Sequence, residues 1–334
     1  MHVRSLAAPG VALLLFFSMA CGGGDDDGAP PPSGQPTAFP TSVDPSKNIP
    51  EDQLNKVNIV IASVDNYVGK NNFVFGITDK KDQPQGGVKT TVTFYDLSDK
   101  ANPKPVETHP AVQSAPGVGK LVTHVHEGGA QHQHGGQDDG RVGYYVEANF
   151  THEGLWGVLV EAQLKDGTKG VATASFLVNK QSQVPSPGQK AYASDNLTRA
   201  DVQDIAEIDS GDPPNDMHDV KIKDAIAKRR PVVIVFSTPA YCASRFCGPV
   251  TEEVENLQET YRDKVDFVHI EVWRDFGKRE FNPTAAEWLG ETEPVVYVVG
   301  RDGVIFDRWE GPVAANIMDA SVQAVAAGKV YGQQ

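Results

Sequence analysis

The sequence predicts two domains, an all-β sandwich followed by an α/β layered domain, behind an exported N-terminal segment. At 334 residues the chain is too long for one ordinary core. Its first half carries short β-type runs divided by turn residues, whereas apolar strands alternate with amphipathic helical segments from about residue 205. Gly (32) and Pro (23) are frequent enough to supply linkers between these parts.

The charge of the chain excludes some classes of partner. The formal net charge is -14 at pH 7. Nucleic acids and anionic membrane surfaces both require a positive binding surface, so we expect no nucleic-acid partner. The one noticeable apolar run, residues 11–20, is too short to span a bilayer, which excludes a polytopic membrane protein.

The N-terminus has the features of an export signal. Arg4 supplies a positive charge, residues 11–17 are apolar, and small residues precede Cys21. Residues 1–20 together with Cys21 resemble the signal peptide and lipobox of bacterial lipoproteins, with Ser18 in the place usually held by Leu. The resemblance implies a lipid on Cys21 that anchors the protein to a membrane of the bacterial cell envelope, facing the extracytoplasmic side. An ordinary secretory signal is the alternative.

Residues 21–52 are rich in Gly, Pro, Ser and Asp, a composition that predicts a disordered linker. Residues 53–180 then predict a sandwich of the immunoglobulin type, because short strands are separated by turn residues. The expected strands are 57–61, 72–77, 90–95, 143–150, 155–162 and 171–178. Within them, residues 143–162 loosely resemble the FixH and YtkA families of extracytoplasmic sandwich domains, which implies a binding or accessory module without catalytic residues.

A second linker is predicted over residues 181–204, followed by an α/β domain over residues 205–331. Residues 231–236 form a continuous apolar run, as expected of a strand buried on both faces. The other expected elements are a helix at 220–229, a helix at 251–261, a strand at 265–272, a short helix at 285–289, strands at 293–299 and 304–309, and a helix at 314–327. Helices alternating with strands are typical of an α/β layer fold.

Three local features of residues 205–331 resemble the thioredoxin fold. Residues 236–242 (Phe-Ser-Thr-Pro-Ala-Tyr-Cys) lead from an apolar strand to a cysteine at a helix entrance. Residues 292–294 (Thr-Glu-Pro) stand where thioredoxin-like proteins carry a cis-proline beside the cysteine pair, and a hairpin at 299–304 follows. The resemblance implies thiol–disulfide exchange without a required cofactor, on the thiols and disulfides of exported proteins. It implies catalytic Cys242 and Cys247, with Tyr241, Glu293 and Pro294 in the substrate groove.

The cysteine region departs from the thioredoxin pattern. Val250 stands where the second cysteine of Trp-Cys-Gly-Pro-Cys would be, and Cys242 lies upstream of Cys247 in a Cys-x4-Cys spacing. Residues 234–236 are apolar, so the buried acid of the thioredoxin strand is missing and proton transfer needs another group or bulk water. Proteins of the Sco type, which share the fold and handle copper, are therefore the alternative resemblance. A non-catalytic binding lipoprotein is a third interpretation.

The spacing of the cysteines favours a loop between them. Pro249 is a natural first residue of a helix, which would place Cys247 directly before that helix. Helix N-termini lower the pKa of a cysteine, and Arg245 would add to this effect. The position after the strand favours Cys242 as the attacking thiol, whereas the Cys-Gly-Pro letters favour Cys247; we lean to Cys242. An inert structural disulfide is the alternative, although so short a loop gains little from being closed.

A histidine-rich segment is the other conspicuous cluster. Two His-x-His pairs stand on a Gly-rich stretch, and imidazole nitrogens of this kind could bind copper, nickel or zinc. The four residues are His124, His126, His132 and His134. The alternative is a polar loop in which the histidines occur by chance. The isolated His152, His218 and His269 are expected to have surface or core roles rather than to bind a metal.

Overall fold

The computed structural model describes residues 49–53, 56–117, 121–125, 131–135, 142–242, 244–290 and 292–333, and only the backbone of 121–125 and 131–135. All of these fall in one compact unit, residues 33–334. The expectations for the signal peptide, for Cys21 and for most of the linker at 21–52 lie outside the described residues.

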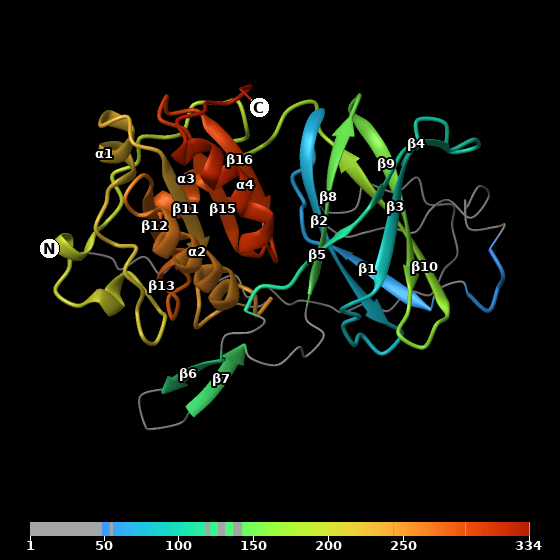
Figure 1. Ribbon diagram of the computed structural model, residues 1–334, viewed down its shortest axis with the longest axis horizontal. Coiled ribbons are helices and arrows are strands. Elements are labelled where there is room, and N and C mark those ends of the chain that lie inside the picture. Colours follow the sequence, from blue (N-terminus) through green and yellow to red (C-terminus); the bar gives the residue numbers. More distant parts are fainter. Residues whose placement is uncertain are drawn as a thin grey trace, which may run out of the picture. The chain divides into compact units, whose positions relative to one another are not determined.

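Two four-stranded antiparallel sheets form a sandwich in the first half of the chain (Figure 1). The first sheet has the order β1 (Val57–Ile61), β2 (Gly69–Asp79), β8 (Gly143–Phe150) and β5 (Val112–Ser114). The second has the order β10 (Lys169–Val178), β9 (Gly154–Gln163), β3 (Lys89–Asp96) and β4 (Lys104–Pro110). All the expected strands lie within these elements, whereas β4 and β5 were missed because their side chains are largely exposed and carry no apolar pattern.

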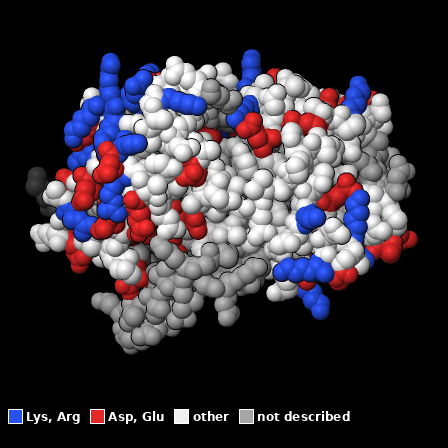
Figure 2. Space-filling model, viewed as in Figure 1, with Lys and Arg blue, Asp and Glu red and all other residues white. Residues whose placement is uncertain are grey.

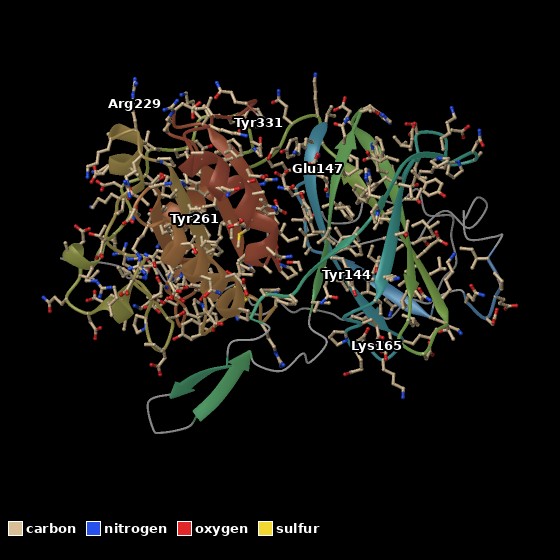
Figure 3. The ribbon with its side chains drawn as sticks, viewed as in Figure 1. Tyr144, Glu147, Lys165, Arg229, Tyr261 and Tyr331 are labelled. Atoms are coloured by element: carbon tan, nitrogen blue, oxygen red, sulfur yellow. A yellow bond between two sulfur atoms is a disulfide. The ribbon has the colours of Figure 1, made fainter. Side chains whose placement is uncertain are left out.

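Aromatic side chains fill the core between these two sheets. Phe73 meets Phe94 edge to face at 5.0 Å between ring centroids, and Phe150 meets Trp156 at the same separation. All four rings are fully buried. At the edge of this core Tyr144, labelled in Figure 3, donates its hydroxyl hydrogen to the carbonyl of Gln85 at 2.7 Å, so its polar end is satisfied.

The histidine-rich segment forms a separate two-stranded antiparallel sheet of β6 (Leu121–Val125) and β7 (Gln131–Gly135). Its register places His124 opposite His132 and Val122 opposite His134. The side chains of both strands, and all of His126, lie outside the described residues. Metal binding by these four histidines therefore stays a prediction.

The second half of the chain is built on a four-stranded sheet in the order β12 (Asp266–Glu271), β11 (Val232–Ser237), β15 (Val295–Val299) and β16 (Ile305–Glu310). The described residues of the same half of the chain contain four α-helices: α1 (Ile222–Ala227), α2 (Cys247–Tyr261), α3 (Pro283–Trp288) and α4 (Ala315–Ala326). They also contain a small two-stranded sheet of β13 (Trp273–Asp275) and β14 (Glu280–Phe281), and two 3-10 turns, Arg199–Asp201 and Ile205–Glu207.

Strand β11 is buried on both faces, which explains its continuous apolar sequence. Val233 and Val235 pack in one cluster with residues of α2 and α4. Val232, Ile234 and Phe236 point the other way and pack with residues of α1 and α3. The strand therefore holds the loop that follows it in a fixed position, because both of its faces are covered.

The predicted fold class is wrong. The chain is mostly β-sheet with a few helices, rather than an immunoglobulin-type sandwich followed by an α/β fold of the thioredoxin type. In the second sheet only β11 and β12 pair in parallel, whereas β15 pairs antiparallel with both β11 and β16. Two of the four described α-helices, α1 and α3, have six residues each. The alternation of strands and helices from about residue 205 indicated an α/β layer fold, but the pairing of strands and the share of the chain in sheet are set by tertiary contacts that the periodicity does not record.

Charged side chains are mixed on the surface. On the face drawn in Figure 2, the Lys and Arg side chains of the described residues lie among Asp and Glu side chains. None of the helices in the described part of the chain combines the length and the apolar character needed to cross a bilayer.

Candidate active site

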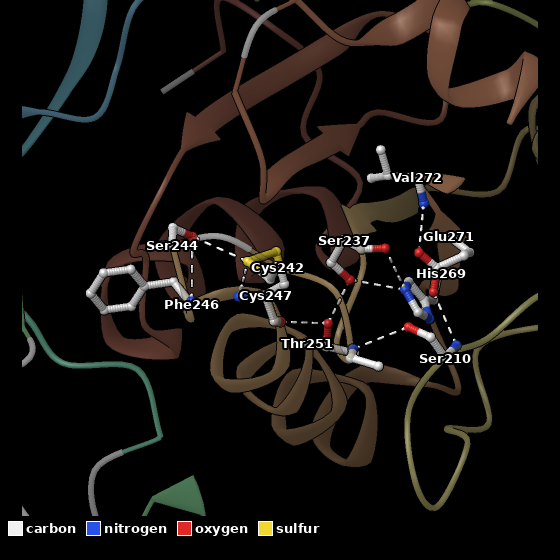
Figure 4. The surroundings of a disulfide bond; sticks show 11 residues. Ser210, Ser237, Cys242, Ser244, Phe246, Cys247, Thr251, His269, Glu271 and Val272 are labelled. Atoms are coloured by element: carbon white, nitrogen blue, oxygen red, sulfur yellow. Dashed lines mark hydrogen bonds between the residues drawn. A yellow bond between two sulfur atoms is a disulfide. The ribbon is translucent and has the colours of Figure 1, made fainter. Parts of the chain in front are cut away.

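Cys242 and Cys247 are joined in a disulfide in the loop between β11 and α2 (Figure 4). Their Cα atoms are 5.9 Å apart, an ordinary separation for a disulfide. Arg245 lies between them with φ of 62°, a left-handed conformation that turns the chain back on itself. Its amide donates to the carbonyl of Cys242 at 3.3 Å, which closes the turn. The Arg245 side chain is exposed, and its expected effect on the thiols stays a prediction.

Helix α2 begins earlier than the sequence indicated. Cys247 is its first residue, so Pro249 is the third helical residue rather than the first. Proline is tolerated there because the first N–H groups of a helix have no partner within the helix. The consequence is that Cys247 belongs to the rigid helix, whereas Cys242 stays in the loop.

The two sulfur atoms lie in different environments. Cys247 is fully buried, whereas Cys242 is half-buried. The backbone N–H of Cys247 donates to the Sγ of Cys242 at 3.3 Å, and the Oγ of Ser244 lies 3.1 Å from the same sulfur. A free N–H at the start of a helix and a hydroxyl group both stabilise a thiolate. After reduction, these donors would favour the thiolate on Cys242, the more accessible sulfur.

Glu293 lies close to the disulfide, directly before Pro294, and the peptide bond between them is cis. One of its carboxylate oxygens and both sulfur atoms lie within 4.8 Å of one another. Its Oε2 is buried without a hydrogen-bond partner among the described residues. Burial, and then the charge of Glu271, raise the pKa of Glu293 to about 7.

Tyr241 opens an aromatic surface beside the disulfide. Its ring stacks on Phe276, with 4.3 Å between the centroids and 5° between the planes. Trp273 then contacts both Phe276 and Phe281. The exposed fractions of Tyr241, Phe276 and Phe281 are 48%, 43% and 46%, which is high for large apolar rings. We call Tyr241, Trp273, Phe276 and Phe281 the aromatic surface.

A chain of buried hydrogen bonds leads from Cys247 into the core (Figure 4). The Thr251 hydroxyl donates to the carbonyl of Cys247 at 2.8 Å, and the Ser237 and Thr251 hydroxyl oxygens are 2.7 Å apart. Because Thr251 has already used its proton, Ser237 donates to Thr251 and accepts from Nε2 of His269 at 2.9 Å. The direction of each bond is therefore fixed, and His269 carries its proton on Nε2.

The chain ends on a buried carboxylate. Oδ2 of Asp209 accepts from the backbone and side-chain N–H groups of Asn215 at 2.9 Å and lies 2.9 Å from Nε2 of His218. The side-chain amide of Asn215 links Asp209 to His269, because it also donates to Nδ1 of His269 at 2.8 Å, and Nδ1 lies 3.7 Å from the same carboxylate oxygen. Burial, together with the charges of His269 and Arg199, lowers the pKa of His218 although Asp209 acts to raise it. The sequence treated His218 and His269 as isolated, because their distance along the chain gives no sign of their common partner Asp209.

Two groups of side chains in the described residues could each bring three ligand atoms to one metal ion. In Asp209, His218 and His269, two imidazoles and a carboxylate suit zinc or iron(II), although the hydrogen bonds above already engage their ligand atoms. In the second group, which combines Glu293 with Cys242 and Cys247, the disulfide leaves no free thiolate.

A cavity of 470 Å³ lies elsewhere in the unit, lined by residues of β2, β16 and the C-terminus. Its floor contains the buried guanidinium of Arg308, which pairs with Asp65 at 2.9 Å and with Glu310 at 3.1 Å. The disulfide does not line this cavity. Since Arg308, Asp65 and Glu310 are paired with one another, we interpret the cavity as part of the packing around Arg308 rather than as the reactive site.

No protein-family model matches the chain, and no curated protein is significantly similar to it. Among solved structures, that of Trgpx in its apo form is 14% identical, with a TM-score of 0.26, and the match covers 34% of this chain and 93% of the other. A superoxide reductase (neelaredoxin) from Ignicoccus hospitalis is 7% identical, with a TM-score of 0.20 and coverage of 37% and 82%.

A CARDB domain from Pyrococcus furiosus, in complex with di-metal ions, is 12% identical, with a TM-score of 0.19 and coverage of 38% and 93%. TM-scores this low assign neither a fold family nor a function to this chain.

Proposed function

We propose that this protein exchanges thiols and disulfides through Cys242 and Cys247. The observation that carries the proposal is the asymmetry of the disulfide, in which Cys242 is half-buried and accepts the N–H at the start of α2 while Cys247 is fully buried. In such a pair the accessible sulfur forms the mixed disulfide with the partner, and the buried sulfur resolves it. A purely structural disulfide has no need of a thiolate-stabilising N–H group.

The partners that we propose are cysteine-containing polypeptides of the extracytoplasmic space. The aromatic surface lies directly beside Cys242 and would bind apolar side chains of a polypeptide, which a small thiol does not offer. Lipidation at Cys21 would keep the protein at a membrane of the bacterial envelope, where disulfides persist. Pro294 and Glu293 would form the other wall of the substrate groove.

The test is a thiol titration of the full chain, purified in detergent, before and after reduction. A reversible couple of two thiols, with turnover on a polypeptide disulfide, is the expected result. The Cys247→Ser variant should trap a mixed disulfide on Cys242, and the Cys242→Ser variant should trap none. The proposal would be overturned if the two thiols never form a disulfide, or if no dithiol reduces the disulfide in the folded protein. Either result would favour a non-catalytic binding protein.

Copper is the second candidate ligand, and the same experiment tests it. The described residues place no histidine in the group around the disulfide, and the sulfurs are joined, so copper would require prior reduction. Stoichiometric copper that protects both thiols of the reduced protein, without turnover on a disulfide, would favour copper delivery. We therefore place thiol–disulfide exchange first.

A further inference from the structure

We propose that Glu293 is the proton carrier of the disulfide, giving a proton to the sulfur of Cys247 on reduction and removing it on oxidation. This inference rests on the proposed thiol–disulfide exchange and supplies the acid and base that exchange requires. The strand leading to the cysteines, β11, offers no titratable side chain, since its six residues are VVIVFS. The proton must therefore come from another element.

The position of Glu293 suits this role. Its carboxylate oxygen lies within 4.8 Å of both sulfur atoms, a distance that one bridging water molecule or a small rotation closes. Cys247 is fully buried, so bulk water cannot protonate its sulfur directly. The buried Oε2 of Glu293 has no hydrogen-bond partner among the described residues and is free to exchange a proton.

Two carboxyl groups at this site have opposite surroundings. Glu271, at the end of β12, accepts the backbone N–H of Ser210 at 3.0 Å and of Val272 at 3.1 Å, so its carboxylate oxygens have hydrogen-bond partners. Glu293 lacks such donors, and the negative charge of Glu271 opposes its ionisation. Among the described residues, the titratable groups near Glu293 are Glu271 and the two cysteines. Pairs of acids whose surroundings differ in this way typically divide the roles of fixed charge and proton donor.

Reduction of the disulfide begins when a partner thiolate attacks Sγ of Cys242. The bond between Cys242 and Cys247 then breaks, and its electron pair stays on the sulfur of Cys247. Protonated Glu293 gives its proton to that sulfur and becomes a carboxylate. A second partner thiolate then attacks the partner sulfur of the mixed disulfide and releases Cys242 as a thiolate. The partner has lost two electrons and gained a disulfide. In the reverse direction, the Glu293 carboxylate deprotonates Cys247, which attacks Cys242 and expels the partner.

The experiment measures how fast a small dithiol reduces the disulfide of the full-length protein between pH 5 and pH 9. Each rate is divided by the concentration of the dithiol's thiolate form, because that concentration itself rises with pH. In the wild-type protein this rate should fall as pH rises through about 7, where Glu293 loses its proton. The Glu293→Gln variant should be slower by about tenfold or more at pH 6 and should show no such fall. The Glu147→Gln variant, which changes an exposed carboxylate on β8, is the matched control and should behave as the wild type.

A second readout needs no turnover. The carboxyl carbon of Glu293, followed by NMR in the oxidised wild-type protein, should titrate near pH 7. In the reduced protein, Glu293→Gln should lower the pKa of the Cys247 thiol, because a neighbouring negative charge is removed. If Glu293→Gln does not fold, the NMR titration and the Glu293→Asp variant, which retains a proton-carrying group, decide the question.

The outcomes separate the two proposals. A Glu293→Gln variant with the wild-type rate profile, or a Glu293 carboxyl that titrates at its ordinary pH, would overturn the role of Glu293 while leaving disulfide exchange intact. A wild-type protein that exchanges with no dithiol at any pH would overturn the proposed function, and the proton carrier with it.

Discussion

The backbone N–H of Cys247 donates to the Sγ of Cys242 at 3.3 Å, so the first residue of α2 stabilises the sulfur of its own disulfide partner. Cys247 is fixed in the helix and buried, while Cys242 lies in the loop beside the surface. From this relationship we expect the two cysteines to differ in reactivity once the disulfide is reduced.

The first prediction concerns Ser244, whose Oγ is 3.1 Å from the sulfur of Cys242. Ser244→Ala should raise the pKa of the Cys242 thiol by about one unit, because a hydrogen bond to a charged group is worth about 1.5 kcal/mol. The pH dependence of alkylation in the Cys247→Ser background measures this pKa. Ser98→Ala, in the sandwich, is the control, and an unchanged pKa in Ser244→Ala would show that the hydroxyl does not stabilise the thiolate.

The second prediction concerns substrate choice. Tyr241→Ala removes a ring of the aromatic surface and should lower kcat/KM for a polypeptide disulfide by roughly fivefold, since an aromatic contact with an apolar side chain of the substrate would contribute about 1 kcal/mol. The rate with a small disulfide should stay the same. Tyr331→Ala, a similarly exposed tyrosine near the C-terminus, should affect neither rate. Equal losses for both substrates in Tyr241→Ala would argue against polypeptide binding by the aromatic surface.

The third prediction concerns the buried Asp209. Asp209→Asn places an amide where three N–H groups converge, and should lower the free energy of unfolding by about 3 kcal/mol. Urea denaturation measures the change. Asp195→Asn, which weakens exposed pairs with Lys221 and Lys223, should lower the free energy of unfolding much less. A similar, small cost for both variants would show that the hydrogen bonds of Asp209 contribute little to stability.

The fourth prediction is the pH dependence of stability. The pKa of Glu293 is raised in the folded protein to about 7, so the folded state binds more protons than the unfolded state between the ordinary pKa of a glutamate and pH 7. Its contribution should therefore lower the free energy of unfolding as pH rises through that range. Glu293→Gln should remove this component, so that the variant gains stability relative to the wild type between pH 5 and pH 8. Chemical denaturation at both pH values gives the comparison, and a constant difference between the two proteins would contradict it.

Much of the local structure could be predicted from the sequence. The apolar run at 231–236 corresponds to β11, and the hairpin signal at 299–304 joins β15 and β16, because side-chain periodicity and turn chemistry act over a few residues. The start of α2 was misplaced by the presence of Pro249, since proline is tolerated at any of the first helical positions. The fold class was misjudged because an alternation of strands and helices along the chain does not fix how the strands pair or how much of the chain is sheet.

By itself the sequence determined where most of the strands and helices lie, that Cys242 and Cys247 stand close together between an apolar strand and a helix, and that Glu293 precedes a proline. Only the tertiary structure decided that Cys247 is the buried sulfur, that Glu293 reaches within 4.8 Å of it, and that His218 and His269 meet at Asp209. The physical reason is that burial and charge interactions depend on distances in space, which arise when segments far apart in the chain pack against the same sheet.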